Sequence, residues 1–330
     1  MKKNYKSLFA ICLALIFCFS FLTTFADSSI DLKNDKKITK AYDYPVKPKT
    51  EEWKKLKTRM EKIDVCQIPE SILNNMTTKA LVESVMNYPL LIDIVARNSN
   101  QEGFDAVYRV FNGLQELTKR SDAIYELKQY QNKVDSFKTE DSEIIVQKYC
   151  IKILLECINL DIDSSNKSSI VYPSLTYSSV YTPRGTTVST YYNSTWADLG
   201  ITLQIAIANR DAFLSRYPST VEVSPVSPAY NCHSYAWYST SSSNLHWMDN
   251  PSAYMTDGSY ISSTCINGNR VYYGAGNHSA IVVDAASWTI RVRSKWGPNA
   301  VFEHDLLDCP YTEGSYNISY WIRNMNQYIR

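Results

Sequence analysis

The sequence predicts an α+β protein in which a helical region precedes a region of helix and antiparallel sheet. Residues 48–162 carry apolar side chains at three- and four-residue spacing among charged ones, which is typical of amphipathic helices. Residues 196–330 contain short β-branched and aromatic runs between turn-like segments, which indicates strands. All four histidines lie in this second region, so we expect any chemistry there.

Composition excludes two classes of protein. The 330 residues contain 34 Lys and Arg against 33 Asp and Glu, so no basic excess predicts nucleic-acid binding. Hydrophobic residues make up 45% of the chain, which argues against intrinsic disorder. This length fits one large domain or two smaller ones.

The first 26 residues have the pattern of a secretory signal peptide. Lysines at the start precede the apolar run Leu8–Leu22, and a small-residue site ends at Ala26. We therefore expect cleavage after Ala26, a secreted protein, and an exposed segment at 27–47. The apolar run is short for a spanning helix, and no later stretch is long and apolar enough, so the mature chain is predicted to have no transmembrane segment.

Residues 48–162 are predicted to form a bundle of four or five helices. Thr77-Thr78 and Ser121-Asp122 are suitable N-caps, and Pro89 should kink or end a helix. The bundle could anchor the protein to a cell wall, inhibit it as a pro-region, or bind a partner. Composition does not choose among these roles.

A Ser/Thr/Tyr-rich connector at 163–195 separates the two regions, either as a linker or as β structure laid on the second region. After it, Trp196–Tyr217 returns to a helical pattern. Strand signals then cluster at Arg270–Tyr273, His278–Asp284 and 287–294.

Six cysteines remain after removal of the signal peptide, and three disulfides are possible in an oxidising compartment. Their pairing stays open. No Cys/His spacing typical of zinc occurs, and neither a metal nor another cofactor is predicted. The six are Cys66, Cys150, Cys157, Cys232, Cys265 and Cys309.

The best candidate for chemistry is Cys232, in the run Pro228–Tyr238. Pro228 and Asn231 favour a helix start there, where free backbone N–H groups stabilise a thiolate. His278 opens an apolar strand 46 residues later and is the candidate base.

A third residue must orient the imidazole of His278. Ser294 is the first candidate, because it ends the next strand. Asn277 and Asp284 are alternatives.

Three runs carry a resemblance to a known family. Asn231–Ser234 (NCHS), Gly268–Tyr273 (GNRVYY) and His278–Val282 (HSAIV) resemble, in this order, the papain-like cysteine peptidase superfamily, with its NlpC/P60 and CHAP branches closest in layout. The run Ser294–Gly297 (SKWG) is similar to the Asn-Ser-Trp-Gly run of papain-type peptidases, with Ser294 in place of Asn.

The resemblance implies a papain-like domain at 196–330 and a secreted thiol-dependent amidase or peptidase that needs no cofactor. It implies a peptide or peptidoglycan-type substrate. No glutamine lies just before Cys232, so the oxyanion would be held by the Cys232 N–H with the side chain of Asn231 or Tyr230.

The other histidines and the tryptophans have less specific roles. On a helix His233 would point away from Cys232, and His304 is expected to be solvated near a turn. His246 lies in a predicted loop. Trp247 and Trp296 are candidates for substrate binding, against the alternative of an aromatic β-core.

Two other functions stay open. In the first, the protein is a non-catalytic binding module in which Cys232 is structural. In the second, the same Cys–His pair transfers an acyl group to an amine. A disulfide at Cys232 would favour the first, and product analysis with an added amine would reveal the second.

Overall fold

The computed structural model describes residues 37–138, 140–162, 176–192, 195–286, 288–313 and 317–325. The predicted signal peptide lies outside these residues. Residues from Ile38 onward belong to one compact unit. The described end of the segment 27–47 packs on the helices, because Tyr44 is buried and its hydroxyl donates to the carbonyl oxygen of Ser84.

The first part of the chain is helical, in shorter segments than the sequence predicts. Helix α5 (Thr78–Met86) begins after Thr77, whose side chain caps its first turn, and ends ahead of Pro89. Pro89 lies between α5 and a short 3-10 helix, η1 (Leu91–Val95), in agreement with the prediction that it kinks or ends a helix. The other helices of this part are α2 (Glu51–Lys55), α3 (Arg59–Val65), α4 (Glu70–Leu73), α6 (Asn100–Tyr108), α7 (Asn112–Leu117), α8 (Ala123–Asp135) and α9 (Ser142–Ile162).

Asp122, one of the predicted N-cap residues, forms a different contact. Asp122 does precede α8, but its side chain does not cap that helix. The carboxylate accepts a hydrogen bond from the Thr78 hydroxyl at 2.7 Å instead, and so joins the starts of α5 and α8.

The second part contains an antiparallel sheet of seven strands in the order β3-β9-β8-β7-β6-β10-β5. The strands predicted from the sequence are β6, β7 and β8. The bounds are β3 (Val221–Ser224), β5 (Tyr260–Ser263), β6 (Arg270–Tyr273), β7 (His278–Asp284), β8 (Arg291–Lys295), β9 (Val301–Asp305) and β10 (Ile318–Arg323).

A smaller sheet lies beside it. Strands β1 (Thr176–Tyr181) and β2 (Thr187–Tyr192) form a hairpin, and β2 pairs with β4 (His246–Trp247). Of the two alternatives for the connector, its described residues therefore form β structure on the second part. The helices here are α10 (Leu203–Arg216), the π-helix η2 (Ser234–Tyr238) and α11 (Ser252–Thr256).

The two faces of the large sheet have different neighbours. On the first, which we call the α10 face, the Phe213 ring of α10 lies 5.1 Å from the ring of Trp296 and 6.3 Å from that of Phe302. On the second, the η2 face, Trp237 of η2 donates to the Ser279 hydroxyl at 2.8 Å. Side chains alternate between the faces along each strand.

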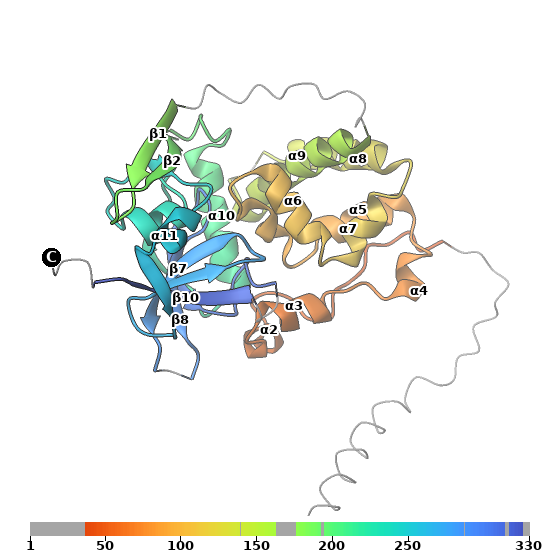
Figure 1. Ribbon diagram of the computed structural model, residues 1–330. Coiled ribbons are helices and arrows are strands. Elements are labelled where there is room, and N and C mark those ends of the chain that lie inside the picture. Colours follow the sequence, from red (N-terminus) through yellow and green to blue (C-terminus); the bar gives the residue numbers. More distant parts are fainter. Residues whose placement is uncertain are drawn as a thin grey trace, which may run out of the picture. The chain divides into compact units, whose positions relative to one another are not determined.

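Helices and sheet share one hydrophobic core. Buried residues of the helices, such as Leu114 and Leu154, belong to the same cluster as Val282 and Phe302 of the sheet. In Figure 1, α10 lies between the helices α5–α9 and the strands of the large sheet, and α10 packs against α9. The boundaries predicted at 163 and 195 stay predictions.

Buried charged side chains of the helical part also contact the second part of the chain. The Asp93 carboxylate of η1 accepts hydrogen bonds from Arg59 at 2.8 Å and from Tyr217 at 2.7 Å. Arg59 also donates to the carbonyl oxygen of Thr312 at 3.0 Å. A second buried pair joins Lys62 to Asp308.

The predicted α+β class, with helices and an antiparallel sheet, is confirmed. Across the described ranges, none of the helices has the length and apolar character needed to cross a membrane.

We expect Asp93→Ala to lower the free energy of unfolding by about 3–5 kcal/mol, because Arg59 would be left charged and unpaired in the core. Urea denaturation measures this. The control Asp43→Ala removes an exposed carboxylate that pairs with Lys47, and it should leave the urea midpoint unchanged. Equal effects of the two variants would contradict the role given to the buried pair.

Candidate functional site

Cys232 lies in the first turn of the short helix that continues as η2. Asn231 caps this turn, since its side-chain oxygen accepts the backbone N–H of Ser234 at 3.1 Å. The same amide holds the following loop, because it also accepts from the N–H of Met248 and donates to the carbonyl oxygen of Met248. Asn231 therefore fixes where the helix starts. A π-helix in this position is a feature found frequently at functional sites.

The sulfur of Cys232 lies between two chain segments. The backbone N–H groups of His233, in its own helix, and of Ser279, in β7, interact with it and favour the thiolate. The residue is almost fully buried, and burial raises the pKa of the thiol to about 12. In this arrangement the thiol is protonated at neutral pH, whereas a nucleophilic cysteine needs a lowered pKa.

None of the six cysteines predicted for the mature chain forms a disulfide with another of the six in this structure. Cys265 is partly exposed and the others are buried. Cys232 is therefore not part of a disulfide in this structure, and its side chain remains a thiol.

His278 is fully buried on the α10 face. Its ring stacks on that of Tyr311, with the ring centres 3.4 Å apart and an angle of 5° between the planes. Among the residues that the structure describes, neither ring nitrogen has a hydrogen-bond partner. The predicted thiol–imidazole hydrogen bond is therefore not formed, and burial holds the pKa of His278 well below its usual range.

Arg97, in the loop that follows η1, holds the turn before His278 and the ring of Tyr311 in place. The Arg97 guanidinium donates to the carbonyl oxygens of Gly276 and Pro310 and lies 4.9 Å from the centre of the Tyr311 ring. A Cβ at Gly276 would come within 2.1 Å of the Tyr311 carbonyl oxygen, so only glycine fits there. The turn before His278 is thus clamped between Arg97 and Tyr311.

Ser294, the predicted orienting residue, contacts a different histidine. Its hydroxyl lies 2.9 Å from Nε2 of His304 and accepts from the Trp296 indole at 3.1 Å. The other nitrogen of His304 lies 2.9 Å from the carbonyl oxygen of Asp305. Because a carbonyl only accepts, Nδ1 carries the proton and Nε2 accepts from Ser294. His304 is buried rather than solvated, so that expectation was wrong.

His233 forms a matching relay on the η2 face. Its Nδ1 lies 2.8 Å from the Ser279 hydroxyl, which accepts from the Trp237 indole, and its Nε2 lies 3.3 Å from Oδ1 of Asn277. Asn277, an alternative for orienting His278, therefore contacts His233. The helical pattern predicted only that His233 points away from Cys232, and no sequence signal paired it with Ser279.

Of the remaining predicted residues, Tyr230 and Trp296 are buried and Asp284 is half-buried. Tyr230 packs in a small cluster with Tyr235 and Val301. Trp296 lies in the core against Phe213, on no surface that a substrate could reach. Asp284, at the far end of β7, accepts from the N–H of Ala286.

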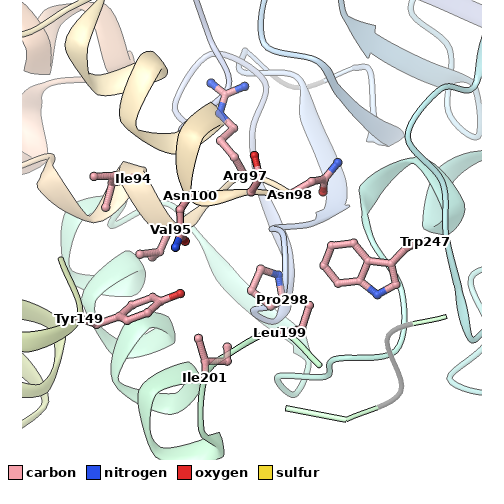
Figure 2. A pocket seen from close by; sticks show the side chains of 11 residues that line it. Ile94, Val95, Arg97, Asn98, Asn100, Tyr149, Leu199, Ile201, Trp247 and Pro298 are labelled. Atoms are coloured by element: carbon pink, nitrogen blue, oxygen red, sulfur yellow. The ribbon is translucent and has the colours of Figure 1, made fainter. Parts of the chain in front are cut away.

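Trp247 is buried too, but it lines a cavity of about 40 Å³ with Arg97 and Pro298 (Figure 2). The cavity lies between the loop after η1 and the segment around Leu199. Its size admits about two or three water molecules. In the described residues no cluster of three His, Cys, Asp or Glu side chains could hold a metal ion.

Comparisons of the chain with protein-family models, with curated proteins and with solved structures find no match. Function must therefore be argued from the residues themselves.

Burial lowers the pKa of His233 to about 4, below the ordinary value of about 6.5. The unfolded chain therefore binds one more proton at this residue between these pH values. His233 stabilises the protein above about pH 6.5, and this contribution is lost as the pH falls toward 4.

We expect His233→Gln to reduce the slope of unfolding free energy against pH by about 1.4 kcal/mol per pH unit near pH 5. Urea denaturation between pH 4.5 and 6.5, roughly the window set by the two pKa values, measures the slope. His246→Gln is the control, because His246 is partly exposed and should change the slope less. An unchanged slope in His233→Gln would show that His233 is not buried in its neutral form.

Proposed function

We propose that the protein is a secreted, papain-like thiol amidase or peptidase with Cys232 as its nucleophile. The supporting observation is the interaction of the backbone N–H of Ser279 with the Cys232 sulfur, which favours the thiolate. It brings the capped helix start and the strand that opens with His278 together at the thiol. This is the layout on which the resemblance to the NlpC/P60 and CHAP branches rests.

In the proposed reaction, His278 accepts the thiol proton and the thiolate attacks a carbonyl carbon of the substrate. The tetrahedral oxyanion is held by the backbone N–H of Cys232, a donor of a kind typically worth about 3 kcal/mol. Collapse breaks the C–N bond, and the leaving amine takes the proton from His278. Water then hydrolyses the thioester and releases a carboxylate.

The stacking of His278 on Tyr311 sets a condition on this reaction. Neither imidazole nitrogen reaches a partner in the described structure, so the ring must turn off Tyr311 before it can accept the proton. Substrate binding is the proposed cause of this turn. A cell-wall peptide is the proposed substrate, on the resemblance alone.

A second candidate function is a binding module in which Cys232 is structural. The observation that favours it is the burial of the thiol, which raises its pKa to about 12. The two functions differ in whether hydrolysis depends on this one sulfur.

We expect Cys232→Ser to reduce hydrolysis of peptidoglycan stem peptides by at least about 1,000-fold, because a serine hydroxyl is far less acidic than a thiol and is a weaker nucleophile beside the same imidazole. New amino groups released from the peptides provide the measurement. The matched control Cys265→Ser changes the partly exposed thiol and should retain activity. Wild-type activity in Cys232→Ser, or no hydrolysis by the wild type, would favour the binding module.

A further inference from the structure

Lys295 ends strand β8 with a fully buried side chain. Its ammonium donates to the carbonyl oxygens of Ser227 at 2.8 Å and Gly297 at 2.9 Å, and it lies 5.3 Å from the centre of the Tyr230 ring. Over the ranges that the structure describes, no carboxylate forms an ion pair with Lys295. A buried charge without an anionic partner is unfavourable, so the position of this lysine calls for an explanation.

Strand alternation places Lys295 on the same face of the sheet as Ser279. Ile281 of β7 lies opposite Arg293 of β8. Ser279 lies two residues before Ile281 and Lys295 two residues after Arg293, and the N–H of Ser279 interacts with the Cys232 sulfur. Side chains two residues apart share a face, so Lys295 and Ser279 both point to the η2 face, where the helix of Cys232 packs.

The segment that precedes Cys232 also contacts Lys295. Tyr230, which lies under the ammonium, is two residues before Cys232, and Ser227 begins the same segment. The contacts of Lys295 with Ser227 and Tyr230 therefore hold strand β8 against the segment that carries the thiol.

We propose that Lys295 is a positioning residue for the nucleophile, whose ammonium stabilises the thiolate of Cys232. This inference rests on the proposed function. Lys295 keeps its proton throughout, and the thiol proton passes to His278. The ammonium thus supplies beside the sulfur the positive charge that His278, stacked on Tyr311, does not supply in the described structure.

The charges around the pair support this role. The pKa of Lys295 is about 7: burial lowers it, and the interaction with the Cys232 thiolate partly opposes that effect. Arg97 also acts on the thiol, but its guanidinium is bound to Gly276, Pro310 and Glu313. The other titratable groups that interact with the thiol from the surrounding elements are Glu102, Tyr191, Tyr272 and Tyr311.

The test is the rate at which iodoacetamide modifies Cys232 at pH 7, followed by mass spectrometry of the peptide. We expect Lys295→Met to slow modification about tenfold or more, because a neighbouring cation lowers a thiol pKa by about 1–3 units. Lys295→Arg keeps the charge and should react at a rate close to that of the wild type. Arg293→Met, two residues earlier on the same face, is the matched control and should also react normally.

Unchanged modification in folded Lys295→Met would overturn the proposal, and so would equal slowing in Arg293→Met. If Lys295→Met does not fold, the reciprocal measurement decides. Coupling between two sites is mutual, so Cys232→Ala should lower the pKa of Lys295 in an NMR titration of its side chain. An unchanged pKa would overturn the proposal.

These measurements are independent of substrate. If Cys232→Ser keeps full hydrolytic activity, the proposed function fails even where Lys295 controls the reactivity of the thiol. If hydrolysis requires Cys232 but Lys295→Met reacts normally, the proposed function stands and the role of Lys295 fails.

Discussion

The geometry of the candidate site depends on the buried carboxylate of Asp93. It accepts hydrogen bonds from Arg59 and Tyr217 and so fixes η1 against α3 and α10. Arg97 follows η1 directly, and its guanidinium clamps the turn that precedes His278. An ion pair far from Cys232 therefore determines where the helical part touches the site. The helices therefore cover the core of the sheet and also hold polar residues of the sheet in position.

Strand alternation explains why the predicted triad does not assemble. His278 and Ser279 are neighbours on β7, so their side chains point to opposite faces of the sheet. Ser279 faces η2 and bonds His233, whereas His278 faces α10 and stacks on Tyr311. Ser294 lies on the α10 face too, but its hydroxyl is taken by His304. Each face has a Trp–Ser–His relay that satisfies one buried imidazole, and His278 belongs to neither.

Local sequence patterns predicted much of this fold, but they did not predict the contacts between distant segments. The cap at Thr77, the helix start at Asn231 and the strand from His278 follow from residues close in sequence. The Tyr311 ring over His278 and the Ser227 carbonyl that binds Lys295 come from distant segments, which no local pattern encodes. For this reason the position of Cys232 in its helix could be predicted, whereas the groups around its sulfur could not.

The electrostatics of the site limit how Cys232 can react. Burial favours the neutral form of the Cys232 thiol, of the His278 imidazole and of the Lys295 amine. Desolvation cannot favour a lone thiolate, but it strengthens the attraction between a thiolate and a cation held beside it. The ammonium of Lys295 is already bound by two carbonyl oxygens, so it is oriented without further loss of side-chain freedom. His278 can form a cation at the sulfur only after it leaves Tyr311. The two groups therefore differ in timing: Lys295 acts on the resting thiol, and His278 acts once its ring has turned.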